Sequence, residues 1–170
     1  MQYDLWPKPK FSDNLKNAFS FNKITLIEDL LNDYFPGYFP ILLPSARFAI
    51  FLCLLNKKIS RKDNIFIFPY ASHCIWDAVS RIGNPNILNA KLSKFKIDYH
   101  QWGFEKKMNP VNLLIEDSAD TFYQKRSQLF SQNGQYEIWS LPKIIGSNIG
   151  GVLWCKNKTD YDSILKLRNN

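Results

Sequence analysis

Three polar clusters stand next to short apolar stretches of the sequence, and their residue types could hold a small-molecule cofactor. One apolar stretch leads into Asp117 and Asp120, a second leads into Ser140 and Lys143, and the glycine-rich segment 146–151 precedes a third. A carboxylate, a lysine amine and a glycine-rich turn at neighbouring strand ends could together bind a cofactor. The residues alone leave a structural interpretation open, in which the aspartates cap a turn and the lysine is a surface cation.

Apolar stretches of strand length alternate along the chain with segments that carry helix caps. We predict strands at 65–68, 86–88, 97–99, 113–115, 137–139 and 152–154. We predict helices at 24–34, 46–56, 73–81 and 160–168, the last three with Ser45, Ser72 and Thr159 as N-caps. Such alternation favours an α/β domain around a largely parallel sheet, in which ligands bind beyond the strand ends.

Composition excludes several broad classes of protein. The chain has 170 residues, of which 45% are hydrophobic and 15% aromatic, so intrinsic disorder is excluded as its main description. The net charge of +7 allows an anionic partner, but the cations are spread along the chain without a nucleic-acid recognition motif. The longest uninterrupted apolar stretch, 48–55, is too short to span a bilayer. The start lacks the apolar core of a secretory signal, and the three scattered cysteines are typical of reduced thiols in the cytoplasm.

The order and spacing of the clusters resemble a known family. Matching stretches are 44–50, 68–73, 115–120 and 140–151, and the tail 165–170 resembles a helix that closes the family's large domain. In the last of the four, Lys143 is followed by a Gly-Gly pair seven and eight residues later. The chain is similar over residues 44–170 to the fold-type-I aminotransferases that depend on pyridoxal 5'-phosphate (PLP), especially the sugar aminotransferases of the DegT/StrS type.

The resemblance implies a chemical role for each matching side chain around the cofactor ring. Lys143 is at the position of the lysine that holds the cofactor aldehyde as a Schiff base. Asp117 matches the carboxylate that keeps the pyridine nitrogen protonated. His73 is at the position of the aromatic residue that stacks on the ring, although a core or surface histidine is equally compatible with the sequence.

The resemblance also implies a phosphate site. Residues Ser45, Ala46 and Arg47 match the helix N-terminus that binds the cofactor phosphate, and Ser140 matches a hydroxyl donor to it. Asp120 is at a position where many members carry Gln or His near the cofactor oxygen. No metal ligand set is expected.

The sequence departs from the family pattern at several points. The usual Gly-Thr of the phosphate helix is Ala46-Arg47, Ile149 replaces a glutamate, and the segment between Gly103 and Ile115 leaves little room for a helix. We divide the chain into an N-terminal helical and extended segment, 1–43, and a PLP-binding large-domain-like region, 44–170. The smaller C-terminal domain of the family is expected to be absent.

The sequence therefore predicts the cofactor-binding part of a PLP-dependent aminotransferase that acts on keto-sugars or nucleotide-sugars with an amino donor, and we expect it to be truncated. The alternative is a noncatalytic remnant or partner-binding domain of the same fold, and a nucleic-acid-binding domain ranks last. A cytoplasmic homodimer without a membrane partner is expected. Surfaces left open by a missing domain would expose Phe35, Tyr38, Phe39, Phe51 and Leu54.

Overall fold

One mixed sheet organises the chain in a computed structural model that describes residue 12 and residues 24–100, 104–121 and 128–170. Its strands lie in the order β1-β7-β6-β5-β4-β2-β3. Their bounds are β1 Phe39–Leu43, β2 Asn64–Ile67, β3 Asn84–Asn86, β4 Phe95–Tyr99, β5 Leu113–Asp117, β6 Tyr136–Ser140 and β7 Gly151–Cys155. The pairs β3-β2, β2-β4, β4-β5 and β5-β6 are parallel, whereas β7 runs antiparallel to both β6 and β1. The predicted mostly parallel α/β fold is confirmed.

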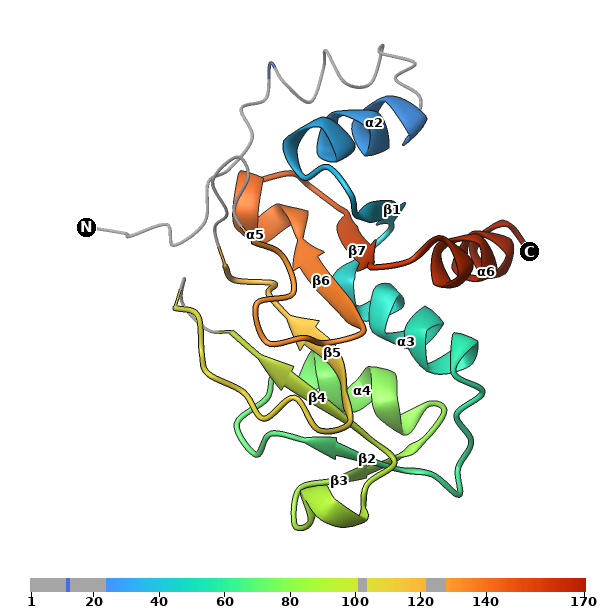
Figure 1. Ribbon diagram of the computed structural model, residues 1–170, viewed down its shortest axis with the longest axis vertical. Helices are drawn as coiled ribbons and strands as arrows, with labels where there is room; N and C mark the ends of the chain where they lie inside the picture. Colours follow the sequence, from blue (N-terminus) through green and yellow to red (C-terminus); the bar gives the residue numbers. More distant parts are fainter. Residues whose placement is uncertain (1–11, 13–23, 101–103, 122–127) are drawn as a thin grey trace.

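Helices cover both faces of the sheet (Figure 1). Their bounds are α2 Ile24–Tyr34, α3 Ala46–Asn56, α4 His73–Ser80, α5 Leu141–Ile145 and α6 Lys158–Asn169, with a short 3-10 helix η1 at Ala90–Leu92. Alternate side chains of a strand point to opposite faces, so each face has its own core. The larger core joins the sheet to α3, α4 and α6, and the smaller one joins it to α2 and α5.

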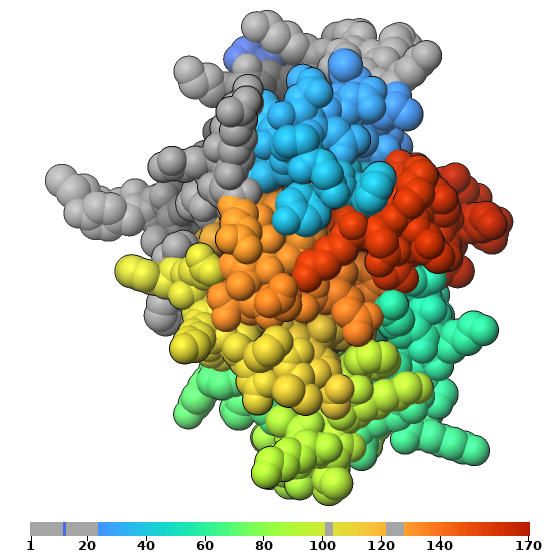
Figure 2. Space-filling view, viewed as in Figure 1, coloured from blue at the N-terminus to red at the C-terminus, as the bar shows by residue number. Residues whose placement is uncertain are grey.

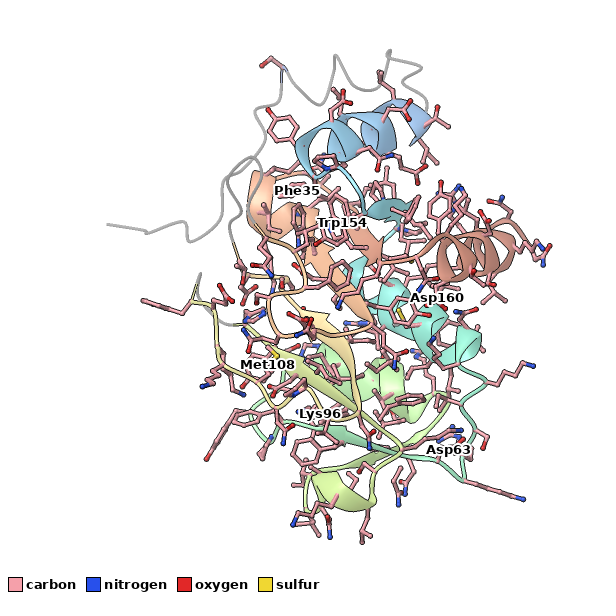
Figure 3. All side chains as sticks on the ribbon, in the orientation of Figure 1. Phe35, Asp63, Lys96, Met108, Trp154 and Asp160 are labelled. Atoms are coloured by element: carbon pink, nitrogen blue, oxygen red, sulfur yellow. The ribbon has the colours of Figure 1, made fainter. Side chains whose placement is uncertain are left out.

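The smaller core is aromatic. Phe35 packs edge-on against Trp139 and Trp154, with ring centroids 5.3 and 5.4 Å apart, and Figure 3 labels Phe35 and Trp154 beneath α2. Glu28 of α2 binds both Arg168 of α6, at 2.7 Å, and the backbone N–H of Leu42, also at 2.7 Å. These contacts attach α2 to the sheet edge and to the last helix.

The strand β1 and the α-helix α5 were not predicted from the sequence. β1 contains Pro40, which interrupts the apolar pattern, but a proline is tolerated there because β1 is an edge strand. The short helix α5 follows Ser140 directly and has Pro142 in its first turn, where a missing N–H costs little. The described part of the β4–β5 connection, 104–112, contains no helix, as its short length suggested.

Several boundaries differ from the predictions. The strand predicted at 86–88 lies at Asn84–Asn86, because Asn86 Oδ1 accepts the backbone N–H of Leu88 and turns the chain away from the sheet. The last helix is capped by Asn157 rather than Thr159, since Asn157 Oδ1 accepts the N–H of Asp160 at 2.8 Å. Ser45 caps α3 as predicted, accepting the N–H of Phe48 at 3.2 Å.

The residues expected to form an open apolar surface are mostly covered. Phe35 and Leu54 are buried in the two cores, and Tyr38, Phe39 and Phe51 are partly buried against them. Other apolar residues are exposed instead, both on α2, where Ile24, Leu26 and Leu30 are each about half exposed, and in loops elsewhere in the described part of the chain, such as Leu88.

Candidate functional site

The carboxyl ends of β5 and β6 bring an acidic group and a basic group to one edge of the sheet. Asp117 is the last residue of β5 and pairs in register with Ile138 of β6. Ser140 ends β6, and the helix that carries Lys143 begins at the next residue. Because β5 and β6 are parallel neighbours, their carboxyl ends lie at the same edge, which is where ligands bind in such sheets.

The Asp117 carboxyl is buried at this edge. Its Oδ1 accepts the backbone N–H of Ala119 at 3.0 Å. Burial raises the pKa of Asp117 from 3.8 to about 6, while the Ala119 hydrogen bond and the positive charge of Lys143 lower the pKa and the Asp120 charge raises it. The carboxyl is thus mostly ionised at neutral pH, and a cation beside it would favour the ionised form further.

Lys143 forms an ion pair within the same cluster. Its Nζ lies 2.6 Å from Oδ1 of Asp120, three residues beyond the end of β5. The side chains are 38% and 20% exposed, so the pair is partly screened from water. The structure therefore brings Asp117, Asp120 and Lys143 together, as the sequence pattern suggested.

The N-terminus of α3 lies beside the end of β6. In the sheet register Gly151 of β7 stands opposite Ser140 on one side and Leu43 on the other. A Cβ added at Gly151 would lie 2.6 Å from the carbonyl carbon of Ser45, so only glycine lets the backbones approach this closely. Ser45, Ala46, Ser140 and Gly151 consequently meet at one tightly packed junction at the N-terminus of α3.

Arg47 and His73 contact side chains of α4. Arg47 Nη1 lies 3.3 Å from Asp77 Oδ2, and Nη2 lies 3.0 Å from Cys74 Sγ, a contact that raises the pKa of Arg47. His73 begins α4 and is exposed, with Nε2 3.8 Å from Cys74 Sγ. Within the described part of the chain, the hydrogen bonds and ion pairs of Arg47 and His73 are thus with Cys74 and Asp77, and the structure does not place either side chain at Asp117 and Lys143.

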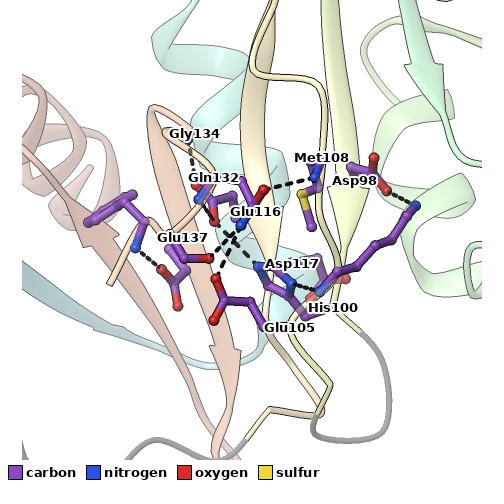
Figure 4. Close-up of polar contacts among 12 residues, drawn as sticks. Asp98, His100, Glu105, Met108, Glu116, Asp117, Gln132, Gly134 and Glu137 are labelled. Carbon is purple, nitrogen blue, oxygen red and sulfur yellow. Dashed lines mark hydrogen bonds and ion pairs between the residues drawn. The ribbon is translucent and has the colours of Figure 1, made fainter. Parts of the chain in front are cut away.

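A network on the opposite face of β5 escaped the sequence analysis. Glu116 is fully buried and accepts the backbone N–H groups of Gln132 and Gly134, while His100 Nε2 lies 3.4 Å from its Oε2 (Figure 4). Glu137, opposite it on β6, accepts the N–H of Phe130 at 2.6 Å. The one available signal was a glutamate inside each of two otherwise apolar strands.

An apolar groove of about 820 Å³ lies next to the junction at the start of α3 and is lined in part by Pro44 and Gly150. It runs between α2, α5 and the turn before β7. Figure 2 shows α2 (blue) next to the orange segment that includes α5 and beside α6 (red). Its lining includes Ile24, Ile27, Leu31, Trp139, Ile144 and Ile149.

The described residues contain no cluster of three or more side chains suited to a metal ion. In the same part of the chain, no helix combines the length and apolar character needed to cross a membrane.

Comparison with known families agrees with this arrangement. A family model described as "Putative PLP-dependent aminotransferase" matches residues 27–170. The chain belongs to this family. The resemblance seen in the sequence is confirmed, and PLP is the cofactor by which the family is described. A search of curated proteins found no match.

Solved structures show the same fold. They include a DegT/DnrJ/EryC1/StrS aminotransferase from Brucella abortus (TM-score 0.70, 14% identity) and Helicobacter pylori PseC, an aminotransferase of pseudoaminic acid biosynthesis (0.72, 14%). They also include Bacillus subtilis NtdA with bound cofactor PMP (0.72, 15%). These matches cover 91%, 96% and 91% of this chain but 52%, 54% and 42% of the respective structures. The chain thus spans about half of their length.

Proposed function

We propose that this chain is the cofactor-binding part of a PLP-dependent aminotransferase that acts on keto-sugars. The observation that carries the proposal is the placement of Asp117 and Lys143 at the ends of adjacent strands, next to the junction at the start of α3. The sugar class of substrate is supported by the names of similar structures, such as PseC. In this reaction an amino donor would supply the amino group that is transferred to the keto-sugar.

The groups present fit the cofactor chemically. Ser140 and backbone N–H groups at the start of α3 would bind an anionic phosphate, because the helix N-terminus carries partial positive charge. Gly151 supports this assignment, since a side chain there would collide with the backbone of Ser45 and Ala46 and displace the start of α3. When bound, PLP supplies an aldehyde that condenses with amines and a pyridine ring that withdraws electrons.

The remaining side chains would position and activate that group. The Asp117 carboxylate would accept a hydrogen bond from the protonated ring nitrogen and stabilise its positive charge. Lys143 would supply the amine that couples to the aldehyde and later move a proton at the substrate carbon. We keep His73 as the residue that stacks on the ring and Arg47 as an additional phosphate partner. Both roles require side-chain positions other than the contacts with Cys74.

The test is covalent capture of the cofactor. Adding PLP to the purified chain should give a visible absorption band, and borohydride should fix the cofactor on Lys143, as located by mass spectrometry. Lys143→Ala should abolish the covalent product, whereas Lys158→Ala, a change at an exposed lysine of α6, should leave it unchanged. Capture at other lysines with none at Lys143 would contradict the proposal.

A partner-binding role is the second candidate, and the exposed apolar groove beside α2 favours it. We propose that a second copy of the chain covers this surface in a homodimer. Sedimentation at micromolar concentration should then show a dimer that Leu30→Asp, on the exposed side of α2, disrupts. We also propose a cytoplasmic location, since the three cysteines are free thiols.

A further inference from the structure

In the structure, the Lys143 amine that the proposed function requires is held in an ion pair with Asp120. Nζ lies 2.6 Å from Asp120 Oδ1, and the Asp120 side chain is only 20% exposed. A lysine donates to a carboxylate as an ammonium group, which has no free electron pair. Only the neutral amine is a nucleophile, so Lys143 cannot attack a carbonyl carbon while this contact persists.

We propose that Asp120 is a positioning residue that holds Lys143 in an unreactive ion pair. The pair opens when Lys143 couples to an aldehyde ligand. The inference rests on the proposed function, in which Lys143 couples to an aldehyde. Asp120 is also a departure from the resembling family, where many members carry Gln or His at this position. Neither of those residues bears a negative charge that could hold the ammonium in this way.

The charges around the pair reinforce this assignment. Asp117 and Asp120 both lie close enough to Lys143 for their charges to interact, and the Asp120 charge raises the pKa of Asp117. One lysine therefore neutralises a site that contains two carboxyl groups. When the Lys143–Asp120 pair opens, the negative charge of Asp120 is no longer neutralised and lies beside an anionic ligand. This repulsion favours the intact ion pair and slows the coupling of Lys143 to the aldehyde.

The coupling step balances without an additional reagent. Lys143 first gives one proton to Asp120 or to water. With an aldehyde ligand present, the neutral amine would form a carbon–nitrogen double bond with the aldehyde carbon, and the aldehyde oxygen would leave as water with the two amine hydrogens. Removing the Asp120 charge removes the competing ion pair and should speed the first of these events.

The closing experiment first measures the reactivity of Lys143 without cofactor. The full chain is treated with trinitrobenzenesulfonate, and the modification rate of each lysine is followed by peptide mass spectrometry. In Asp120→Asn the rate at Lys143 should rise about tenfold, the low end for loss of a charged hydrogen bond. Asp162→Asn is the matched control, because it breaks the exposed Lys158–Asp162 pair and should change the rate at Lys158 by less than about fivefold.

Two further variants separate charge from folding. Asp120→Glu keeps the charge and should keep Lys143 slow, whereas Asp120→Gln should be fast like Asp120→Asn and replaces Asp120 if that variant does not fold. Circular dichroism establishes that each variant retains its helices. A rate at Lys143 that is equal or lower in both neutral variants would overturn the proposal.

Capture by PLP and borohydride then distinguishes the two proposals. Faster modification together with faster capture in Asp120→Asn supports both. Faster modification with no capture in any variant supports the ion-pair proposal and contradicts the proposed cofactor function. Equal modification with capture in the wild-type chain overturns the ion-pair proposal and leaves the cofactor function standing.

Discussion

Gly151 of β7 lies in direct contact with Ser45, the N-cap of α3, because a Cβ at Gly151 would lie 2.6 Å from the Ser45 carbonyl carbon. Both residues belong to well-buried or hydrogen-bonded elements that cannot easily separate, since β7 is paired with a strand on each side. The contact fixes where the N-terminus of α3 points. It therefore connects the packing of the sheet to the proposed phosphate site.

Gly151→Ala should destabilise the fold and weaken binding of PLP. We expect a loss of about 1–3 kcal/mol in the free energy of unfolding, because backbone rather than a flexible side chain must move. Urea unfolding measures this loss. Gly83→Ala is the control, since its added Cβ would meet only the side-chain ends of Ile59 and Ile65 and a carbonyl at 3.1–3.5 Å. An equal loss in both variants would contradict the special role of Gly151.

Asp117→Asn should stabilise the fold at neutral pH while weakening cofactor capture. Burial raises the pKa of Asp117 from 3.8 to about 6, so the folded chain binds this proton more tightly than the unfolded chain. Stability from this group is therefore greatest below pH 4 and falls as the pH rises to 6. The cost above pH 6 is about 3 kcal/mol, from roughly 1.4 kcal/mol per pKa unit. The neutral Asn avoids it.

Urea unfolding of wild type and Asp117→Asn between pH 4 and 8 measures this effect. The stability difference should be smallest near pH 4 and reach its plateau above pH 6. Asp63→Asn is a control of opposite sign, because a hydrogen bond from Lys94 lowers the pKa of Asp63. Its carboxylate contributes stability that is present above about pH 4 and is lost only at lower pH, so this variant should be less stable than wild type by a constant amount between about pH 4 and 8. A pH-independent difference for Asp117→Asn would contradict the assignment.

Much of the fold could be predicted from the sequence because the buried strands β2, β4, β5, β6 and β7 are short apolar stretches and α3 has an N-cap serine. The strand β1 could not, since Pro40 breaks the apolar pattern and pairing with β7 depends on distant residues. The predicted position of β3 was wrong by two residues, because the polar residues Asn84–Asn86 pair with β2, whereas the apolar Leu88 is 90% exposed.

The candidate site was predictable to a different extent on each strand. Asp117 and Lys143 follow adjacent strands, so the parallel pattern alone suggested that they lie at one edge. The ion pair with Asp120 could not be foreseen, because it depends on how α5 turns Lys143 back toward β5. The buried Glu116 network was missed because its backbone donors come from a loop without a sequence signature.

Cys74 should be the thiol that reacts first in the folded chain. Burial raises the pKa of Cys53 well above its usual range and that of Cys155 to about 12, so both thiols are protonated and shielded. Cys74 is partly exposed and lies 3.0 Å from Arg47 Nη2. Iodoacetamide followed by mass spectrometry should label Cys74, with Cys53 and Cys155 labelled only after unfolding in urea. Early labelling at Cys155 would contradict the buried position.

Glu116→Gln should be strongly destabilising, although the two side chains have nearly the same shape and only one oxygen is replaced by an NH₂ group. The two carboxylate oxygens accept hydrogen bonds from Gln132 N–H, Gly134 N–H and His100 Nε2, whose other ring nitrogen accepts the N–H of Lys106. A glutamine has only one acceptor oxygen, so its NH₂ group must face a buried donor. Leaving such donors unpaired should lower the free energy of unfolding by about 2–4 kcal/mol in urea titrations. The control Asp162→Asn, at an exposed position, should change the free energy of unfolding by no more than about 0.5 kcal/mol. A loss for Glu116→Gln no larger than that would show that the network does not hold the loop containing Gln132 and Gly134.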